Sequence, residues 1–174
     1  MAKVVDILRK YTRVAPVDVE SIAHDLGVRV VRDFLGPKIS GKIQRDTTGT
    51  YTIVVNAGES PARQRFTIAH ELAHYLYHRD LIGDGVSDSP AYRAPDETIY
   101  QTTRLEKRHE VQANQFAANL LMPKELVGSL ETHFDLAMPQ LAERLGVSLP
   151  ALRVRKGLSP YPDASEEFHA VDAD

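Results

Sequence analysis

The segment at residues 70–74, His-Glu-Leu-Ala-His, constrains the fold of this chain more than any other feature. On an α-helix, two histidines four positions apart can converge on one ion, because residues i and i+4 lie about 6 Å apart along the axis and roughly 40° apart around it. The flanking sequence supports a helix, because Ser60 is a good N-cap and Pro61 is tolerated at the first helical position. We therefore predict a helix from Ser60 to about Arg79.

The spacing within this segment fits a metal site. The imidazoles of His70 and His74 can bind one ion at about 2.0–2.1 Å each, and zinc accepts imidazole and carboxylate ligands. Glu71 lies beside the first histidine, where it can take a proton from water without binding the ion itself, so we predict it as a general base. The chain has no cysteine, so the ligands must be His, Asp or Glu. We expect Zn²⁺, with Mn²⁺ able to replace it.

A zinc site of this kind needs a third protein ligand. His78 continues the four-residue spacing, but it lies about 12 Å along the helix axis from His70, so we expect it beside the site or at the surface. Glu110 is the leading candidate, because it lies in a later segment of helical spacing whose apolar residues predict packing against the first helix. The spacing leaves His109 and Glu106 open as alternatives.

The rest of the chain predicts an α+β fold. Five short segments precede the metal-binding helix, of which 2–12 and 17–26 have helical spacing and 28–33, 39–44 and 51–56 are β-branched runs. We expect a small antiparallel sheet of about three strands packed on zincin-like helices, in a domain that spans residues 1–134. The strand at 51–56 is expected to offer an edge to a substrate strand. Residues 80–104 contain Gly and Pro without periodicity, which predicts a long surface excursion.

Residues 135–158 have helix-turn-helix-like spacing, with a break at Gly146 and an N-cap at Ser148. Residues 159–174 follow with five acidic groups and no Lys or Arg, which predicts a disordered acidic tail. The whole chain has 21 basic and 24 acidic residues, a formal net charge of −3, and so no overall basic field. Together with Pro150 near the start of the second helix, this charge opposes direct nucleic-acid binding.

Two strings carry a resemblance to a known family. Residues 65–78, Arg-Phe-Thr-Ile-Ala-His-Glu-Leu-Ala-His-Tyr-Leu-Tyr-His, and residues 110–123, Glu-Val-Gln-Ala-Asn-Gln-Phe-Ala-Ala-Asn-Leu-Leu-Met-Pro, resemble the ImmA/IrrE family of zinc metallopeptidases. Counting weaker flanking matches, the likeness covers roughly residues 15–158. Ala73 stands where the family more often has Gly, at a cost of one methyl group, and residues 79–108 match no family motif that we recognise.

The resemblance implies site residues and a function. It implies His70, His74 and Glu110 as zinc ligands, Glu71 as the catalytic base, and Asn114 as a support for the site. The family is one of regulatory endopeptidases, so the resemblance implies cleavage of a helix-turn-helix transcriptional repressor in a stress or mobile-element response. The alternative is a DNA-binding or partner-sequestering transcriptional regulator that uses the C-terminal helix-turn-helix-like segment.

Three further expectations complete the sequence analysis. We see no signal peptide and no run of about 18 apolar residues, so a cytoplasmic protein with no membrane contact is expected. The C-terminal half can support a homodimer. Peptide hydrolysis also needs a donor for the negative charge that develops on the substrate oxygen. The spacing singles out none of the candidates, which are Tyr75, Tyr77, His78, His109 and the arginines.

Overall fold

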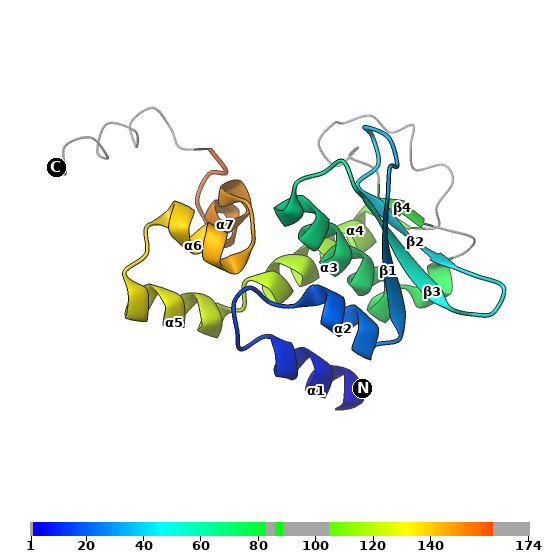
Figure 1. The fold of residues 1–174 in the computed structure, drawn as a ribbon, viewed down its shortest axis with the longest axis horizontal. Helices are drawn as coiled ribbons and strands as arrows, with labels where there is room; N and C mark the ends of the chain where they lie inside the picture. Colours follow the sequence, from blue (N-terminus) through cyan, green and yellow to red (C-terminus); the bar gives the residue numbers. More distant parts are fainter. Residues whose placement is uncertain (1, 83–85, 89–104, 162–174) are drawn as a thin grey trace.

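The computed structural model describes residues 2–82, 86–88 and 105–161 (Figure 1). Its architecture confirms the predicted α+β class. The helices are α1 (Ala2–Tyr11), α2 (Val19–Asp25), α3 (Pro61–Tyr77), α4 (Lys107–Leu121), α5 (Lys124–Phe134), α6 (Met138–Leu145) and α7 (Leu149–Arg155), with a 3₁₀ turn at Arg79–Leu81. The strands are β1 (Val28–Asp33), β2 (Gly41–Arg45), β3 (Tyr51–Asn56) and β4 (Val86–Asp88). In Figure 1, α3 and α4 lie between the sheet and the α5–α7 group.

The described sheet has the order β1-β3-β2-β4 and mixed pairing. β2 runs antiparallel to β3, as the hairpin turn between them requires, and it also runs antiparallel to β4. β1, in contrast, runs parallel to β3. The expected purely antiparallel sheet of about three strands therefore needs correction. The turn at 46–49 fixes only the β2–β3 pair, and nothing local in the sequence states on which side β1 joins.

β3 is a central strand. Val54 lies opposite both Val31 of β1 and Lys42 of β2, so both backbone edges of β3 are already paired. The expectation that residues 51–56 offer an edge to a substrate strand is wrong. Ile53, Val54 and Val55 are buried in succession, so this part of β3 is covered on both faces as well.

α3 forms as its capping residues predict. The Ser60 hydroxyl accepts a hydrogen bond from the backbone N–H of Arg63, Pro61 is the first helical residue, and the helix ends at Tyr77. Its middle is buried from Thr67 to His74, so polar residues of the metal-binding motif share the core with apolar ones. A helix that is buried over two turns holds its side chains in defined positions.

One hydrophobic core joins the sheet to helices that precede it and helices that follow it in the sequence. Its largest fully buried apolar side chains come from α2, the sheet, α3, the end of α4, α6 and α7. They are Ile22, Ile43, Ile53, Ile68, Leu72, Leu121, Met122, Leu141, Leu145 and Leu152. α6 ends at Gly146, whose φ of +67° suits glycine, and the Ser148 hydroxyl caps α7 as predicted. α6 and α7 therefore pack on the body that holds α3.

Parts of two predicted segments lie outside the described residues. These are most of the excursion at 80–104, within which residues 86–88 form β4, and the tail from residue 162 onward. Among the helices that the structure does describe, none has the length and apolar character needed to cross a membrane.

Candidate metal centre

Three side chains from α3 and α4 converge at one point. The Nε2 atoms of His70 and His74 lie 3.0 Å apart. The carboxylate of Glu110 places Oε2 3.1 Å from Nε2 of His70 and Oε1 3.4 Å from Nε2 of His74. Both rings are buried and the Glu110 side chain is 13% exposed. Two imidazole nitrogens and one carboxylate therefore face each other at the edge of the core.

The donor set fits a single metal ion. A tetrahedral ion with bonds of about 2.1 Å separates its donor atoms by about 3.4 Å, close to the three distances between these side chains. Two neutral imidazoles and one carboxylate are ligands that zinc prefers, and three protein ligands leave a fourth position open. Among the described residues, these are the side chains whose donor atoms cluster closely enough for a metal.

The α3 and α4 helices bring these residues together because they pack antiparallel. His70, in the middle of α3, contacts Asn114 near the middle of α4, whereas His78 at the end of α3 lies against His109 in the first turn of α4. His70 and His74 are four residues apart, so they share the face of α3 that meets Glu110.

Hydrogen bonds behind the two histidines fix their orientation. Nδ1 of His70 lies 3.0 Å from Oδ1 of Asn114, which fits the supporting role that the family resemblance implies for this asparagine. Nδ1 of His74 lies 3.0 Å from Nδ1 of His78, and Nε2 of His78 lies 3.0 Å from Oε1 of Gln112. His78 thus lies beside the site and its ring nitrogens point away from the ion position.

The electrostatics favour the protonation states that a metal needs. Burial would raise the pKa of Glu110, but its hydrogen bonds with His70 and His74 outweigh burial and lower the pKa to about 2. Burial lowers the pKa of His74, mainly because a charged imidazolium loses its hydration there, and lowers that of His78 for the same reason. A carboxylate and neutral imidazoles are the species that bind zinc.

Glu71 lies between the two histidines in the sequence and is fully buried. The helix carries it next to His70 but on a different face, since neighbouring residues are about 100° apart around the axis. This position keeps the carboxylate out of the ligand set while leaving it within the same buried region. The role of Glu71 as a general base stays a prediction.

The structure does not place the alternative ligands at this point. Glu106 is the N-cap of α4 with a side chain that is 63% exposed, and its backbone N–H donates to Nδ1 of His109. Two of the candidates for the oxyanion donor have other contacts. Tyr75 donates its hydroxyl proton to the backbone oxygen of Leu26, and Tyr77 packs against Phe116 and His78.

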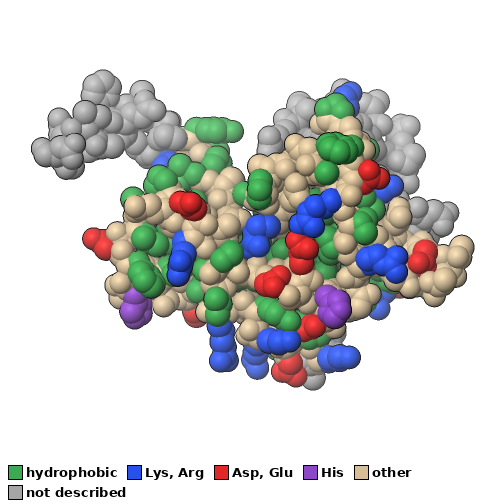
Figure 2. Space-filling view, viewed as in Figure 1, with side chains coloured by type: hydrophobic (Ala, Val, Ile, Leu, Met, Phe, Trp, Pro, Cys, Tyr) green, Lys and Arg blue, Asp and Glu red, His purple; other side chains and the backbone are tan. Residues whose placement is uncertain are grey.

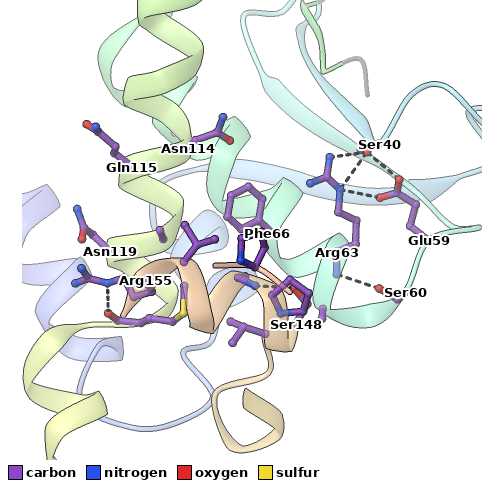
Figure 3. Close-up of a pocket in the computed structure, with 18 of the residues that line it drawn as sticks. Ser40, Glu59, Ser60, Arg63, Phe66, Asn114, Gln115, Asn119, Ser148 and Arg155 are labelled. Carbon is purple, nitrogen blue, oxygen red and sulfur yellow. Dashed lines mark hydrogen bonds and ion pairs between the residues drawn. The ribbon is translucent and has the colours of Figure 1, made fainter. Parts of the chain in front are cut away.

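An open groove begins one helical turn from the metal ligands. Phe66 precedes His70 by four residues on α3, and Asn114 follows Glu110 by four on α4, and both line a cavity of about 820 Å³ (Figure 3). We call this cavity, bounded by α3, α4, α7 and the loops before α3, the α3–α4–α7 groove. Its apolar lining is Pro37, Ala62, Phe66, Ala118, Met122, Val147, Pro150, Ala151, Val154 and Pro160. Its polar lining is Ser40, Glu59, Ser60, Arg63, Asn114, Gln115, Asn119, Ser148 and Arg155.

Sequence reasoning missed one residue that touches the site's supports, Gln112. It follows Glu110 by two positions, and residues i and i+2 of a helix do not share a face. It meets His78 only because α3 ends beside the first turns of α4. His78 was named from its spacing, and it lies beside the site, which is one of the two places expected for it.

The fold and the cluster together define a class of α+β protein in which a His-Glu-x-x-His helix and a glutamate from a later antiparallel helix form one metal-binding arrangement. The chain belongs to the peptidase family of IrrE N-terminal-like domains, whose model matches residues 23–156. This match contains α3, α4 and all three clustered side chains.

Two curated relatives are named radiation response metalloprotease IrrE. The protein from Deinococcus deserti is 42% identical over 101 residues, which cover 56% of this chain and 33% of that protein. The protein from Deinococcus radiodurans is 35% identical over 99 residues, which cover 55% of this chain and 27% of that protein. The matched part of this chain therefore spans a third or less of their length.

A solved structure shares the fold. The chain described as a Mycobacterium tuberculosis transcriptional regulator superposes with a TM-score of 0.55 at 21% sequence identity, covering 92% of this chain and 48% of that chain. At this identity the match supports the architecture alone.

Proposed function

We propose that this protein is a zinc-dependent endopeptidase. The observation that carries the proposal is the convergence of Nε2 of His70, Nε2 of His74 and the Glu110 carboxylate at separations of 3.0–3.4 Å, with buried Glu71 on the same helix. When bound, Zn²⁺ polarises the scissile carbonyl and makes a water molecule more acidic. Mn²⁺ can take the same ligands.

The chain's own residues handle the proton and the ion. Glu71 takes a proton from the attacking water as the water oxygen bonds to the carbonyl carbon. It returns the proton to the leaving amine as the C–N bond breaks. His70, His74 and Glu110 hold the ion in place. The two histidine rings are buried, which keeps bulk water from hydrogen bonding to their ligand nitrogens. Asn114 keeps the His70 ring oriented.

The α3–α4–α7 groove supports a protein substrate. It starts about 6 Å along each helix from the ligands, so we propose that residues two or three positions from the scissile bond reach it. Its volume of about 820 Å³ is large enough for several side chains. Its mainly apolar lining suits a segment that is exposed when a small protein domain opens or docks.

We propose a helix-turn-helix transcriptional repressor as that substrate, cleaved in a stress or mobile-element response. The resemblance of residues 65–78 and 110–123 to the regulatory family supports this, as does the radiation response in the names of both Deinococcus relatives. A repressor acts on DNA, so the cytoplasm is the proposed compartment. A homodimer stays a prediction, which light scattering on purified protein tests.

The test pairs cleavage with metal binding. A helix-turn-helix repressor encoded beside this gene is incubated with the protein and Zn²⁺ or Mn²⁺, and fragments are identified by mass spectrometry. Glu71→Gln keeps the volume of the side chain and removes the base, so we expect at least about a 100-fold loss of cleavage with zinc still bound. His133→Gln, on the exposed face of α5, is the matched control and keeps both. Cleavage that survives in Glu71→Gln would refute the proposed role.

A further inference from the structure

We propose that His78 and Gln112 form a positioning relay that keeps the proton of His74 on Nδ1 and so leaves its Nε2 free for the metal. The inference rests on the metal site of the proposed function and concerns residues that do not touch the ion. It assigns to His78 a role as hydrogen-bond acceptor, which is specific enough to test.

The direction of each hydrogen bond follows from the geometry. Nε2 of His74 faces His70 and Glu110, so it must offer a lone pair when a metal is bound. A neutral imidazole has one proton, so the proton of His74 is then on Nδ1. Nδ1 of His78 lies 3.0 Å away and must accept it, which places the single proton of neutral His78 on Nε2. That proton is donated to Oε1 of Gln112, also 3.0 Å away.

The partners of His78 on both sides favour a proton on its Nε2 rather than on its Nδ1. If His78 had its proton on Nδ1, two N–H groups would face each other in a region where both rings are at most 6% exposed. An amide oxygen at Nε2 favours the productive tautomer, because an oxygen accepts and cannot donate. His109 packs against the His78 ring, with centroids 4.7 Å apart, and limits its rotation.

The two ligands are therefore supported differently. His70 is held by one amide, Asn114, whereas His74 is held by a second imidazole and then by an amide from another helix. The relay ties the last turn of α3 to the first turns of α4, the same two helices that supply the metal ligands. Gln112 is exposed, so water can replace part of its function, and the larger effect is expected at buried His78.

The first measurement uses the unchanged full chain. In zinc-loaded ¹⁵N-labelled protein, the ring nitrogen shifts report which nitrogen of each histidine carries the proton. We expect the proton on Nδ1 in His74 and on Nε2 in His78. A proton on Nδ1 of His78 would overturn the relay, and this measurement does not depend on whether any variant folds.

The second measurement is zinc affinity, obtained by competition with a chelating dye. His78→Leu removes the acceptor, and we expect zinc affinity to fall by roughly 10–100-fold. His78→Gln restores an acceptor oxygen and should recover to within about threefold of the wild type. Gln112→Leu should give a smaller loss than His78→Leu. His133→Leu, which removes an exposed histidine of α5 outside both the relay and the groove, is the control.

The outcomes separate the relay from the proposed function. Unchanged zinc affinity in His78→Leu overturns the relay, and so does a loss that His78→Gln fails to recover, since that result would indicate packing rather than hydrogen bonding. In either case cleavage by the wild type and its loss in Glu71→Gln would leave the peptidase proposal intact. Absence of zinc binding by the wild type would instead reject the metal site itself.

Discussion

Zinc should stabilise this protein through two buried histidines and one partly buried glutamate, by an amount that follows from chain size and mass action. A ligand that binds only the folded state at 100 times its Kd adds about 2.7 kcal/mol, and each further tenfold adds about 1.4 kcal/mol. An unfolding entropy of about 2.1 cal/mol/K per residue over 174 residues makes 1 kcal/mol equivalent to about 2.7 °C. We therefore expect the Tm to rise by about 7 °C at 100 times Kd, and by about 4 °C per further decade.

The assay is thermal unfolding of chelator-treated protein at a series of buffered free Zn²⁺ concentrations. His70→Ala and Glu110→Ala each remove a ligand whose donor atom lies within 3.1 Å of the other, so their curves should stay flat over the range where the wild type rises. His133→Ala removes an exposed histidine of α5 and should follow the wild type. The reasoning is refuted by a wild-type Tm that does not depend on zinc, or by a rise that persists in His70→Ala.

Two further predictions concern the metal-free fold. Burial lowers the pKa values of His74 and His78 below the usual 6.5, so the unfolded chain binds protons that the folded chain refuses. The contribution of these two histidines to the unfolding free energy should be greatest above pH 6.5. It should decrease as the pH falls, by up to about 1.4 kcal/mol per pH unit for each histidine. An unfolding free energy that stays constant in urea denaturation from pH 7.5 to 5 would contradict this. Gly41→Ala would press a methyl group against the Thr67 side chain and 2.9 Å from the carbonyl oxygen of Val54, at a cost of about 1–3 kcal/mol. Gly128→Ala in α5 meets open space and should stabilise by about 0.5–1 kcal/mol, so the two variants should shift the Tm in opposite directions.

Local chemistry made α3 and its histidines predictable from the sequence. Ser60 and Pro61 define the start of a helix through groups that lie within a few residues, and the spacing of His70 and His74 follows from helix geometry alone. The observed helix, Pro61–Tyr77, differs from the expected one by two residues at its end. Glu110 needed the family resemblance, because helical spacing alone left two neighbours open.

Features that depend on distant segments were not predictable in the same way. The parallel pairing of β1 with β3 joins strands separated by β2, and no turn between them fixes their relative direction. β4 is three residues long, too short for an alternating pattern to indicate a strand. The contact of Gln112 with His78 joins the start of α4 to the end of α3, so it depends on how the two helices cross. In each case the missing information is tertiary.

The helix-turn-helix-like segment shows why spacing alone does not establish DNA binding. α6 and α7 form at the predicted positions, but the basic residues of α7 make contacts within the protein. Arg153 is buried and donates from Nε to the backbone oxygen of Ser159, and Arg155 donates from Nε to the backbone oxygen of Met122. Val154 lines the α3–α4–α7 groove. On the face drawn in Figure 2, basic and acidic side chains are interspersed.

A reading helix must present its side chains to base edges, and phosphate contacts need free cations around it. Releasing Arg153 for DNA would leave the backbone oxygen of Ser159 without its guanidinium partner. α7 therefore lines the α3–α4–α7 groove, and both of its arginines donate hydrogen bonds within the protein, which weakens the DNA-reading alternative.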